Sequence, residues 1–250
     1  MNEPLVSVIM PAYKCASTIR AAIDSVLIQN VPLELLVIDD CSPELLDEAL
    51  DPYRNEERVK FYRNEQNLGA AASRNRAIGL ARGPYIAFLD ADDIWKPEKL
   101  EKQLDRMTEM NADLVCSSYE IIDENAKNCR PAHKVPAQLS FSSMLLRNDI
   151  GCSTVIAKAG ILRKYRFEEK LYHEDYVLWL QMLRDGCIAV ACEEALVSWR
   201  LIHNSRSYNK FKSAKNRWRI YREYLKLPFF KTVYCFFAYA VYGLKKYFLN

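Results

Sequence analysis

The stretch GAAASRNRAIGLARGPYIAFLDADDIWKPEKLEKQLDRM (residues 69–107) decides the fold of this 250-residue chain. An alanine-rich helical pattern ends at Gly83, YIAFLD (85–90) is apolar enough for a buried strand, and KPEKLEKQLDRM (96–107) is helical again. A strand between two helices is typical of the right-handed βαβ units that build a mostly parallel sheet. The stretch therefore predicts an α/β fold.

The same alternation runs through the first 120 residues. Apolar runs predict further strands at 6–10, 33–39, 59–63 and 113–122. Helical signals begin near Ser17, where apolar residues recur at helical spacing, and at Ser42, which would cap a short helix opened by Pro43. We expect an open, mostly parallel sheet flanked by helices.

Beyond residue 125 the alternation weakens. We expect a polar loop at 125–138, a strand at 152–158, a helix ending at Gly186 and two short strands at 187–191 and 195–203. The predicted organisation is one α/β domain over residues 1–205, made of two parts (1–120 and 121–205), followed by a helical tail (206–250).

Acidic side chains stand where the predicted strands end. Asp39 and Asp40 follow the second strand, and DADD (residues 90–93) follows the fourth. Ligands of open parallel sheets bind outside the carboxyl ends of the strands, so these acids and Pro11–Tyr13 are expected to face one crevice. DADD predicts a site for Mg²⁺ or Mn²⁺, which carboxylates hold together with water and substrate phosphates. The alternative is a loop that caps the next helix.

Composition excludes several other classes of protein. With 50% apolar and 27% charged residues, the chain is a folded protein and not a disordered one. Its seven glycines form neither G-x-G-x-x-G nor a Walker A sequence, which argues against a dinucleotide oxidoreductase and a P-loop enzyme. The eight cysteines contain no C-x-x-C pair, so we interpret them as buried thiols in a reducing cytosol.

The segment HEDYVLW (173–179) places two acids at the start of a predicted helix. We interpret Glu174 as a helix cap, because an acid is favoured at a helix N-terminus. Asp175 is either a second such acid or a general base that projects into the crevice, and the residues alone leave both readings open.

Four segments together resemble a known family. VSVIMPAYKCASTIRAAIDSVLIQ, LLVIDDCSPE, the stretch from Asn67 to Leu104, and HEDYVLWLQML are similar, in order and spacing, to glycosyltransferase family 2 on a GT-A fold. The resemblance covers about residues 4–200 and points to the bacterial surface-polysaccharide type. It implies that residues 1–205 are a catalytic domain with a nucleotide-sugar half (1–120) and an acceptor half (121–205). Small departures occur at Lys14, Cys15 and Cys41, and none removes a group that the mechanism needs.

The resemblance implies roles only where the motifs match. Pro11, Tyr13 and Asp40 stand where the family contacts the nucleobase and ribose, and Arg74 matches a basic position near the nucleotide. Asp92 matches the metal ligand on the diphosphate, with Asp90 nearer the ribose.

Two further positions match with unequal strength. Asp175 matches the catalytic acid of the family's ED motif, which favours the general-base reading. His203 stands where related enzymes often place a histidine near the metal, and a hydrogen-bonded loop histidine is an equal alternative.

The implied activity is an inverting, metal-dependent transfer of a sugar, from a nucleotide sugar that we expect to be UDP-linked, to an acceptor hydroxyl. The acceptor would be lipid-linked, such as a polyprenyl-diphosphate sugar, or an oligosaccharide. Two alternatives are a sugar-phosphate nucleotidyltransferase, which normally shows a glycine-rich loop that PAYKCAS lacks, and a catalytically silent, membrane-associated binding protein.

The tail differs in charge from the rest of the chain. Residues 199–250 hold 12 Lys or Arg and one acid, Glu223, for a net charge of +11, whereas residues 1–198 carry −8. Basic and aromatic residues in a helical rhythm predict an in-plane helix on an anionic membrane surface. The alternative is a helical pair packed on the catalytic domain or on a second copy in a homo-oligomer.

These features predict a location for the protein. The start MNEPLVSVIM lacks a basic lead, so we expect no signal peptide and a cytoplasmic enzyme, peripheral at the inner face of the cell membrane. We expect no nucleic-acid partner, because the first 198 residues are acidic.

Overall fold

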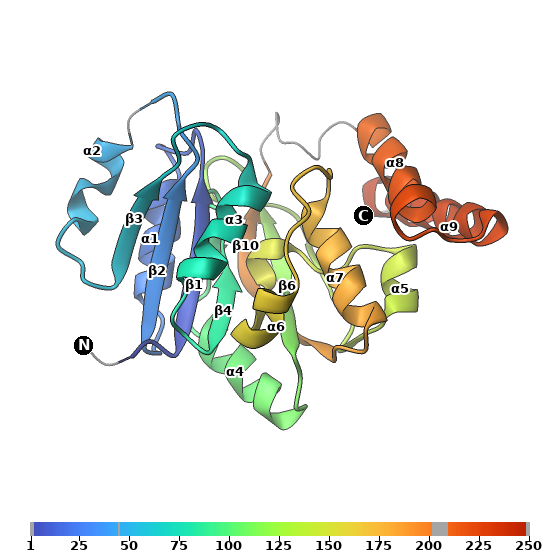
Figure 1. The fold of residues 1–250 in the computed structure, drawn as a ribbon, viewed down its shortest axis with the longest axis horizontal. Coiled ribbons are helices and arrows are strands. Elements are labelled where there is room, and N and C mark those ends of the chain that lie inside the picture. The colour runs from blue at the N-terminus through green and yellow to red at the C-terminus, as the bar shows by residue number, and fades with distance from the viewer. Residues whose placement is uncertain (1–2, 45, 202–209, 249–250) are drawn as a thin grey trace.

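The computed structural model describes residues 3–44, 46–201 and 210–248. Ten strands form one sheet with helices on both faces, and the last helices lie at the end of the molecule opposite α2 (Figure 1). The strands are β1 Val6–Ala12, β2 Leu33–Asp39, β3 Val59–Arg63, β4 Tyr85–Phe88, β5 Ile94–Trp95, β6 Leu114–Ile122, β7 Asn128–His133, β8 Gln138–Leu139, β9 Ile156–Lys158 and β10 Ala189–Arg200.

The sheet has the order β3-β2-β1-β4-β9-β6-β10-β5, with β7 paired to β6 and β8 to β10. β3, β2, β1 and β4 are parallel neighbours, and β6 is parallel to β10. β9 lies between β4 and β6 and is antiparallel to both. The carboxyl ends of the parallel strands therefore meet at one edge, the upper edge in Figure 1.

The helices divide the core into two layers. Their bounds are α1 Ile19–Leu27, α2 Asp47–Leu50, α3 Ala70–Leu80, α4 Lys99–Glu109, α5 Phe141–Leu146, α6 Ala159–Lys164, α7 Glu174–Arg184, α8 Lys210–Arg219 and α9 Phe229–Phe248. α3, α5, α6 and α7 bury apolar side chains against one face of the sheet, around Phe88 and Trp179. α1 and α4 cover the other face, around Met10 and Trp95.

Most predicted elements of the first 120 residues are present, but the short helix is misplaced. α2 begins at Asp47, five residues after Ser42. Ser42 instead binds the loop after β1, because its Oγ accepts the backbone N–H of Lys14 over 3.2 Å. The predicted cap thus joins two strand ends.

Other corrections fall in the second half. The polar loop predicted at 125–138 contains β7, whose residues Asn128–Ala132 are exposed and pair along β6. The two strands predicted at 187–203 form one bulged strand, β10. The sequence missed α5 and α6, which have six residues each. Of the eight free cysteines, four are buried and Cys129 is exposed.

The tail packs on the catalytic domain as a helical unit. α8 continues into a π-helical segment, Ile220–Tyr224, and α9 follows after a short turn. α9 contacts α5 and α8. Among the helices in the described part of the chain, none is both long and apolar enough to cross a membrane.

Candidate active site

Asp93 anchors the acidic turn that follows β4. Its carboxylate is 1% exposed and accepts hydrogen bonds from Ser153 Oγ at 2.5 Å and from the Arg200 backbone N–H at 2.8 Å. Burial is the main cause of its raised pKa, and the nearby charges of Asp92 and Asp90 add to it. Asp93 therefore has a structural role, and the other two acids of the motif, Asp90 and Asp92, are available for ligand binding.

Arg200, at the end of β10, fixes the backbone of the same turn. Its Nε donates to the Asp92 carbonyl oxygen at 2.8 Å, and its Nη1 donates to the carbonyl oxygens of Asp123 and Glu124 at 3.0 and 2.9 Å. Sequence reasoning missed Arg200 and Ser153. The only signal for Arg200 was a cation that ends an apolar run, SWR, near the predicted strand ends.

Asp92 and Asp90 supply two partly exposed carboxylates at the strand edge. Burial raises the pKa of Asp92 to about 6, and the negative charge of Asp90 contributes to the shift. Two carboxylates that repel each other in a partly desolvated place favour a proton or a metal cation between them. These are the residues expected as metal ligands, and the structure brings them together.

Arg74 connects Asp90 to the start of α7. It is 5% exposed and projects from α3, and its two terminal nitrogens bind Asp90 Oδ1 at 2.5 Å and Glu174 Oε1 at 3.1 Å. Glu174 is buried as well, so the reading of Glu174 as a helix cap alone is wrong. Its carboxylate forms an ion pair with Arg74, which lies 100 positions away in the chain, so the sequence around Glu174 gives no sign of it.

Asp175, the expected general base, follows Glu174 and remains partly exposed. Burial raises its pKa to about 6, the adjacent Glu174 charge adds to the rise, and Arg74 opposes it. Its Oδ1 accepts the backbone N–H of Tyr176 at 2.7 Å. His173, which precedes the helix, has a left-handed backbone with φ 67°, so the chain turns sharply where the two acids begin.

The charges of these groups all act on one buried side chain, the thiol of Cys152. Burial raises its pKa; the positive charge of Arg74 opposes the rise, and the negative charges of Asp90, Asp175 and Glu174 add to it. Acids from the end of β4 and the start of α7 therefore lie within electrostatic range of one side chain. Asp175, whose pKa is raised to about 6, is therefore suited to take a proton from a hydroxyl of a substrate that binds near Asp90 and Asp92.

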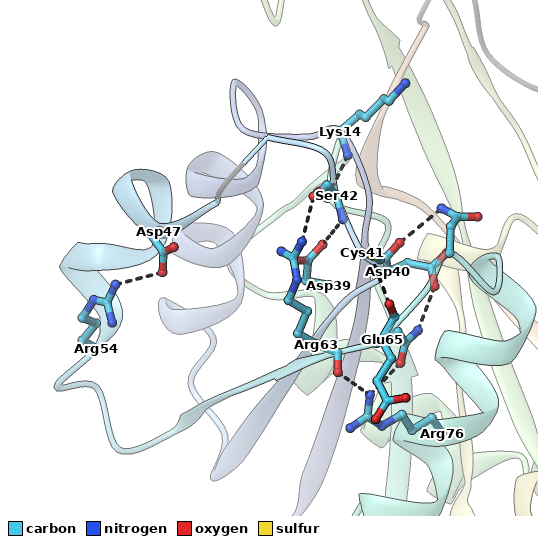
Figure 2. Close-up of polar contacts among 12 residues, drawn as sticks. Lys14, Asp39, Asp40, Cys41, Ser42, Asp47, Arg54, Arg63, Glu65 and Arg76 are labelled. Atoms are coloured by element: carbon cyan, nitrogen blue, oxygen red, sulfur yellow. Dashed lines mark hydrogen bonds and ion pairs between the residues drawn. The ribbon is translucent and has the colours of Figure 1, made fainter.

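The ends of β1 and β2 lie near the acidic turn that follows β4. Burial raises the pKa of the Cys15 thiol, just after β1, to about 12, and the charges of Asp92 and Asp39 contribute. Asp39 binds Arg63 and accepts the backbone N–H of Ser42 at 2.9 Å (Figure 2). The ends of three strands therefore meet around Cys15.

Asp40 lies at the N-terminus of α3. Its 3%-exposed carboxylate accepts hydrogen bonds from the side chain of Asn64 at 2.8 Å and from the backbone N–H groups of Leu68 and Gly69 at 2.9 and 2.7 Å. It therefore holds the loop that starts the helix carrying Arg74. Contact between Asp40 and a nucleobase stays a prediction.

The remaining expected residues are placed as follows. Pro11 lies within β1, opposite Ile38 of β2. Tyr13 follows β1 with 45% of its surface exposed, and the side-chain nitrogen of Lys14 lies 5.4 Å from its ring centroid. The ammonium end of Lys14 points away from the cluster of Asp39 and Ser42 (Figure 2). His203 lies outside the described residues.

Asp90 and Asp92 are the described carboxylates that would hold a metal at these strand ends. In residues 3–44, 46–201 and 210–248, no group of three or more His, Cys, Asp or Glu side chains is arranged around a common point. The carboxylates of Asp90 and Asp92 nevertheless match the oxygen donors that Mg²⁺ and Mn²⁺ take alongside phosphate and water.

The chain is similar in sequence to known glycosyltransferases. The chain is 37% identical over 246 residues to a putative teichuronic acid biosynthesis glycosyltransferase, TuaG, of Bacillus subtilis, covering 98% of each chain. It is also 37% identical over 248 residues to WfgD of Escherichia coli, named UDP-Glc:alpha-D-GlcNAc-diphosphoundecaprenol beta-1,3-glucosyltransferase, covering 98% of this chain and 96% of that one.

Solved structures show the same fold. TarS of S. aureus, residues 1–349 in complex with UDP-GlcNAc, superposes with a TM-score of 0.73 at 18% identity, covering 96% of this chain and 72% of that one. The complex of TarS with UDP gives a TM-score of 0.70 and covers 98% and 73%. The sheet order and flanking helices are thus those of a GT-A fold.

The pattern of Glycosyl transferase family 2 matches residues 7–170, which contain the ends of β1, β2 and β4 and the helix that carries Arg74. That match and the relatives that align over nearly the whole chain lead to one conclusion: this chain belongs to glycosyltransferase family 2 and is a glycosyltransferase.

Proposed function

We propose that the enzyme transfers a sugar from a UDP-sugar to a hydroxyl of a lipid-linked acceptor, with inversion at the anomeric carbon, in the assembly of a surface polysaccharide. Support comes from the activities for which the relatives are named. One is a teichuronic acid enzyme, and another uses UDP-Glc and a diphosphoundecaprenol acceptor to form a β-1,3 bond. TarS, which shares the fold, was solved with UDP and with UDP-GlcNAc.

One observation carries the proposal: the partly exposed Asp175 directly follows Glu174, and Glu174 and Asp90 bind the same buried Arg74 guanidinium. In the proposed reaction Asp175 takes the proton of the acceptor hydroxyl, whose oxygen attacks the anomeric carbon as the bond to the diphosphate breaks. Attack from the opposite face gives a β-glycoside from an α-linked donor. A positioned base of this kind contributes about 10²- to 10⁴-fold to the rate.

Asp92 and Asp90 would hold a divalent cation, Mg²⁺ or Mn²⁺. When bound, the cation neutralises negative charge that develops on the leaving diphosphate. Burial raises the pKa of Asp92 and the negative charge of Asp90 adds to the rise, and a bound cation would offset that repulsion. Pro11, Tyr13 and Asp40 would contact the nucleoside, with the exposed Tyr13 ring available to lie against it.

Membership of a glycosyltransferase family argues against both alternatives, the sugar-phosphate nucleotidyltransferase and the silent binding protein. A direct test is to incubate the purified chain with UDP-glucose, UDP-galactose and their N-acetyl forms, with Mg²⁺ or Mn²⁺ and a synthetic GlcNAc-diphospho-lipid. We expect one donor to yield UDP together with a β-linked product. UDP release without lipid product, or an α-linked product, would refute the acceptor or the inversion respectively.

The Asp175→Asn variant tests the role of the base. Turnover should fall by about 10²-fold or more, while UDP-sugar affinity stays within a few-fold, because the donor does not need the base. Asp185→Asn is the matched control, because Asp185 is exposed at the other end of α7. Near-normal turnover of Asp175→Asn would show that another group accepts the proton.

A further inference from the structure

α9 has an apolar side that the protein does not cover. Phe229, Phe230, Val233, Tyr234 and Phe237 recur at helical spacing and are 55%, 86%, 43%, 64% and 68% exposed. We call these five residues the outer strip. At 100° per residue, they fall within one side of the helix. Side chains of this size rarely gather on a surface without a partner.

The opposite side of α9 is fully used in packing. Thr232 and Cys235 are buried there, and the Phe236 ring lies 5.4 Å from the ring of Trp218 in α8. α9 also contacts α5 of the catalytic domain. The helix is therefore apolar on two sides, and only the inner side is explained by the fold.

Arg217 of α8 locks the tail in place. It is 4% exposed, and its guanidinium carbon lies 3.6 Å from the ring centroid of Tyr176 in α7 and 4.6 Å from that of Tyr239 in α9. The Tyr176 hydroxyl donates to the Met144 carbonyl oxygen of α5 at 2.8 Å, and Tyr221 donates to the neighbouring Leu145 carbonyl. The outer strip thus has a fixed orientation relative to α7, which carries Asp175.

The charge around the outer strip indicates its partner. Lys226 precedes α9, Lys231 stands at the border of the strip, and Lys215 and Arg222 are exposed on the adjoining segments. The net charge of +11 for residues 199–250 would make two such surfaces repel each other. An anionic lipid surface satisfies both features, because aromatic side chains enter the interface while cations meet the headgroups.

We propose that α9 lies in the plane of an anionic membrane and inserts the outer strip among the lipids, so that the catalytic domain is held at a fixed angle to the membrane. The inference deepens the proposed function, since a lipid-linked acceptor would be presented in the same surface. The experiment tests membrane binding independently of the proposed activity, because lipid binding is measured without donor or acceptor.

The experiment is co-sedimentation of the full chain with vesicles of phosphatidylcholine and phosphatidylglycerol. Phe230→Ser combined with Phe237→Ser should raise the lipid concentration for half-maximal binding by about tenfold or more. Ile28→Ser combined with Leu80→Ser removes two exposed apolar side chains elsewhere and should change nothing. Replacing Lys226 and Lys231 by Gln, or raising salt from about 0.1 M to about 1 M, should also weaken binding.

Three outcomes would overturn the proposal. One is equal binding to vesicles of phosphatidylcholine alone, which would remove the role of charge. Another is unchanged binding of the Phe230→Ser, Phe237→Ser variant. The third is conversion of a dimer to a monomer by that variant in sedimentation velocity, which would show that the outer strip joins two copies of the chain. Circular dichroism identifies variants that retain the fold and can be compared.

Discussion

Arg74 of α3 and Glu174 of α7 stand 100 positions apart in the chain and form a buried ion pair of 3.1 Å. The second arm of Arg74 binds Asp90 at the end of β4. One guanidinium therefore joins a helix N-terminus, a strand end and a second helix at the edge where the nucleotide is expected. Because Asp175 follows Glu174 directly, its position depends on this pair.

Arg74→Met should destabilise the fold and shift the pH profile. Removing one partner of a buried ion pair leaves an unpaired charge, so the free energy of unfolding should fall by about 3–5 kcal/mol in urea denaturation. Arg74 also lowers the pKa of Asp175, so any remaining activity should need a higher pH. Arg184→Met, an exposed cation of α7, should cost no more than about 0.5 kcal/mol. Similar costs for the two variants would contradict the structural role of the pair.

The pH dependence of turnover should report the Asp175 carboxyl. With its pKa raised to about 6, the group is a carboxylate above that pH and is protonated below it. A base must be deprotonated, so kcat should be level near pH 8 and fall by about tenfold per unit below about pH 6. The measurement uses saturating donor and cation, so that protonation of Asp92 does not limit binding. A kcat that stays level down to about pH 4 would exclude a base with this pKa.

Asp92→Asn should weaken cation-dependent binding of UDP. The substitution keeps the shape of the side chain and removes its negative charge, which Asp90 repels. It also removes a carboxylate, the kind of ligand that Mg²⁺ and Mn²⁺ prefer. Titration calorimetry with UDP should show about tenfold weaker binding with the cation and little change in EDTA. Asp105→Asn, at an exposed position of α4, should bind as the parent does. Equal losses with and without the cation would point to a contact with UDP itself.

Arg217→Met should loosen the tail. A desolvated cation–π contact contributes about 2 kcal/mol, so the free energy of unfolding should fall by about that amount in denaturant titration. Near-ultraviolet circular dichroism should lose tyrosine signal, because Tyr176, Tyr221 and Tyr239 surround the guanidinium. Arg219→Met removes an exposed i,i+4 pair with Glu223 and should cost about 0.3–0.5 kcal/mol. If Arg219→Met lowered the free energy of unfolding more than Arg217→Met does, Arg217 would not be the residue that fixes the tail.

The first half of the fold was predictable because its strands are apolar runs bounded by turn residues. Leu33–Asp39 and Val59–Arg63 begin and end where the sequence indicates. β7 was not predictable in this way. It pairs with one strand only, and its first five residues are all exposed, so its sequence carries no alternating pattern of burial. β10 was divided in two because its bulges near Cys192 and Ala195 break the alternation.

The site divides along the same line. Asp90, Asp92 and Asp175 could be named as candidates because local motifs place acids next to strand and helix ends, and their roles stay predictions. Glu174 was misread because its partner lies far away in sequence, and Ser153 and Arg200 support Asp93 and Asp92 through contacts that only the folded chain creates. Sequence patterns therefore indicate candidate ligand-binding side chains more readily than they indicate the side chains that fix those candidates in position.

The antiparallel insertion of β9 between β4 and β6 affects how the chain can be divided. Both neighbours are made from residues before 123, but the strand that joins them comes from residues 156–158. A fragment ending near residue 120 would leave the backbone amides and carbonyls of two apolar strands open to pairing with other molecules, which is a common route to aggregation. During synthesis, the sheet can close only after residues 156–158 have left the ribosome.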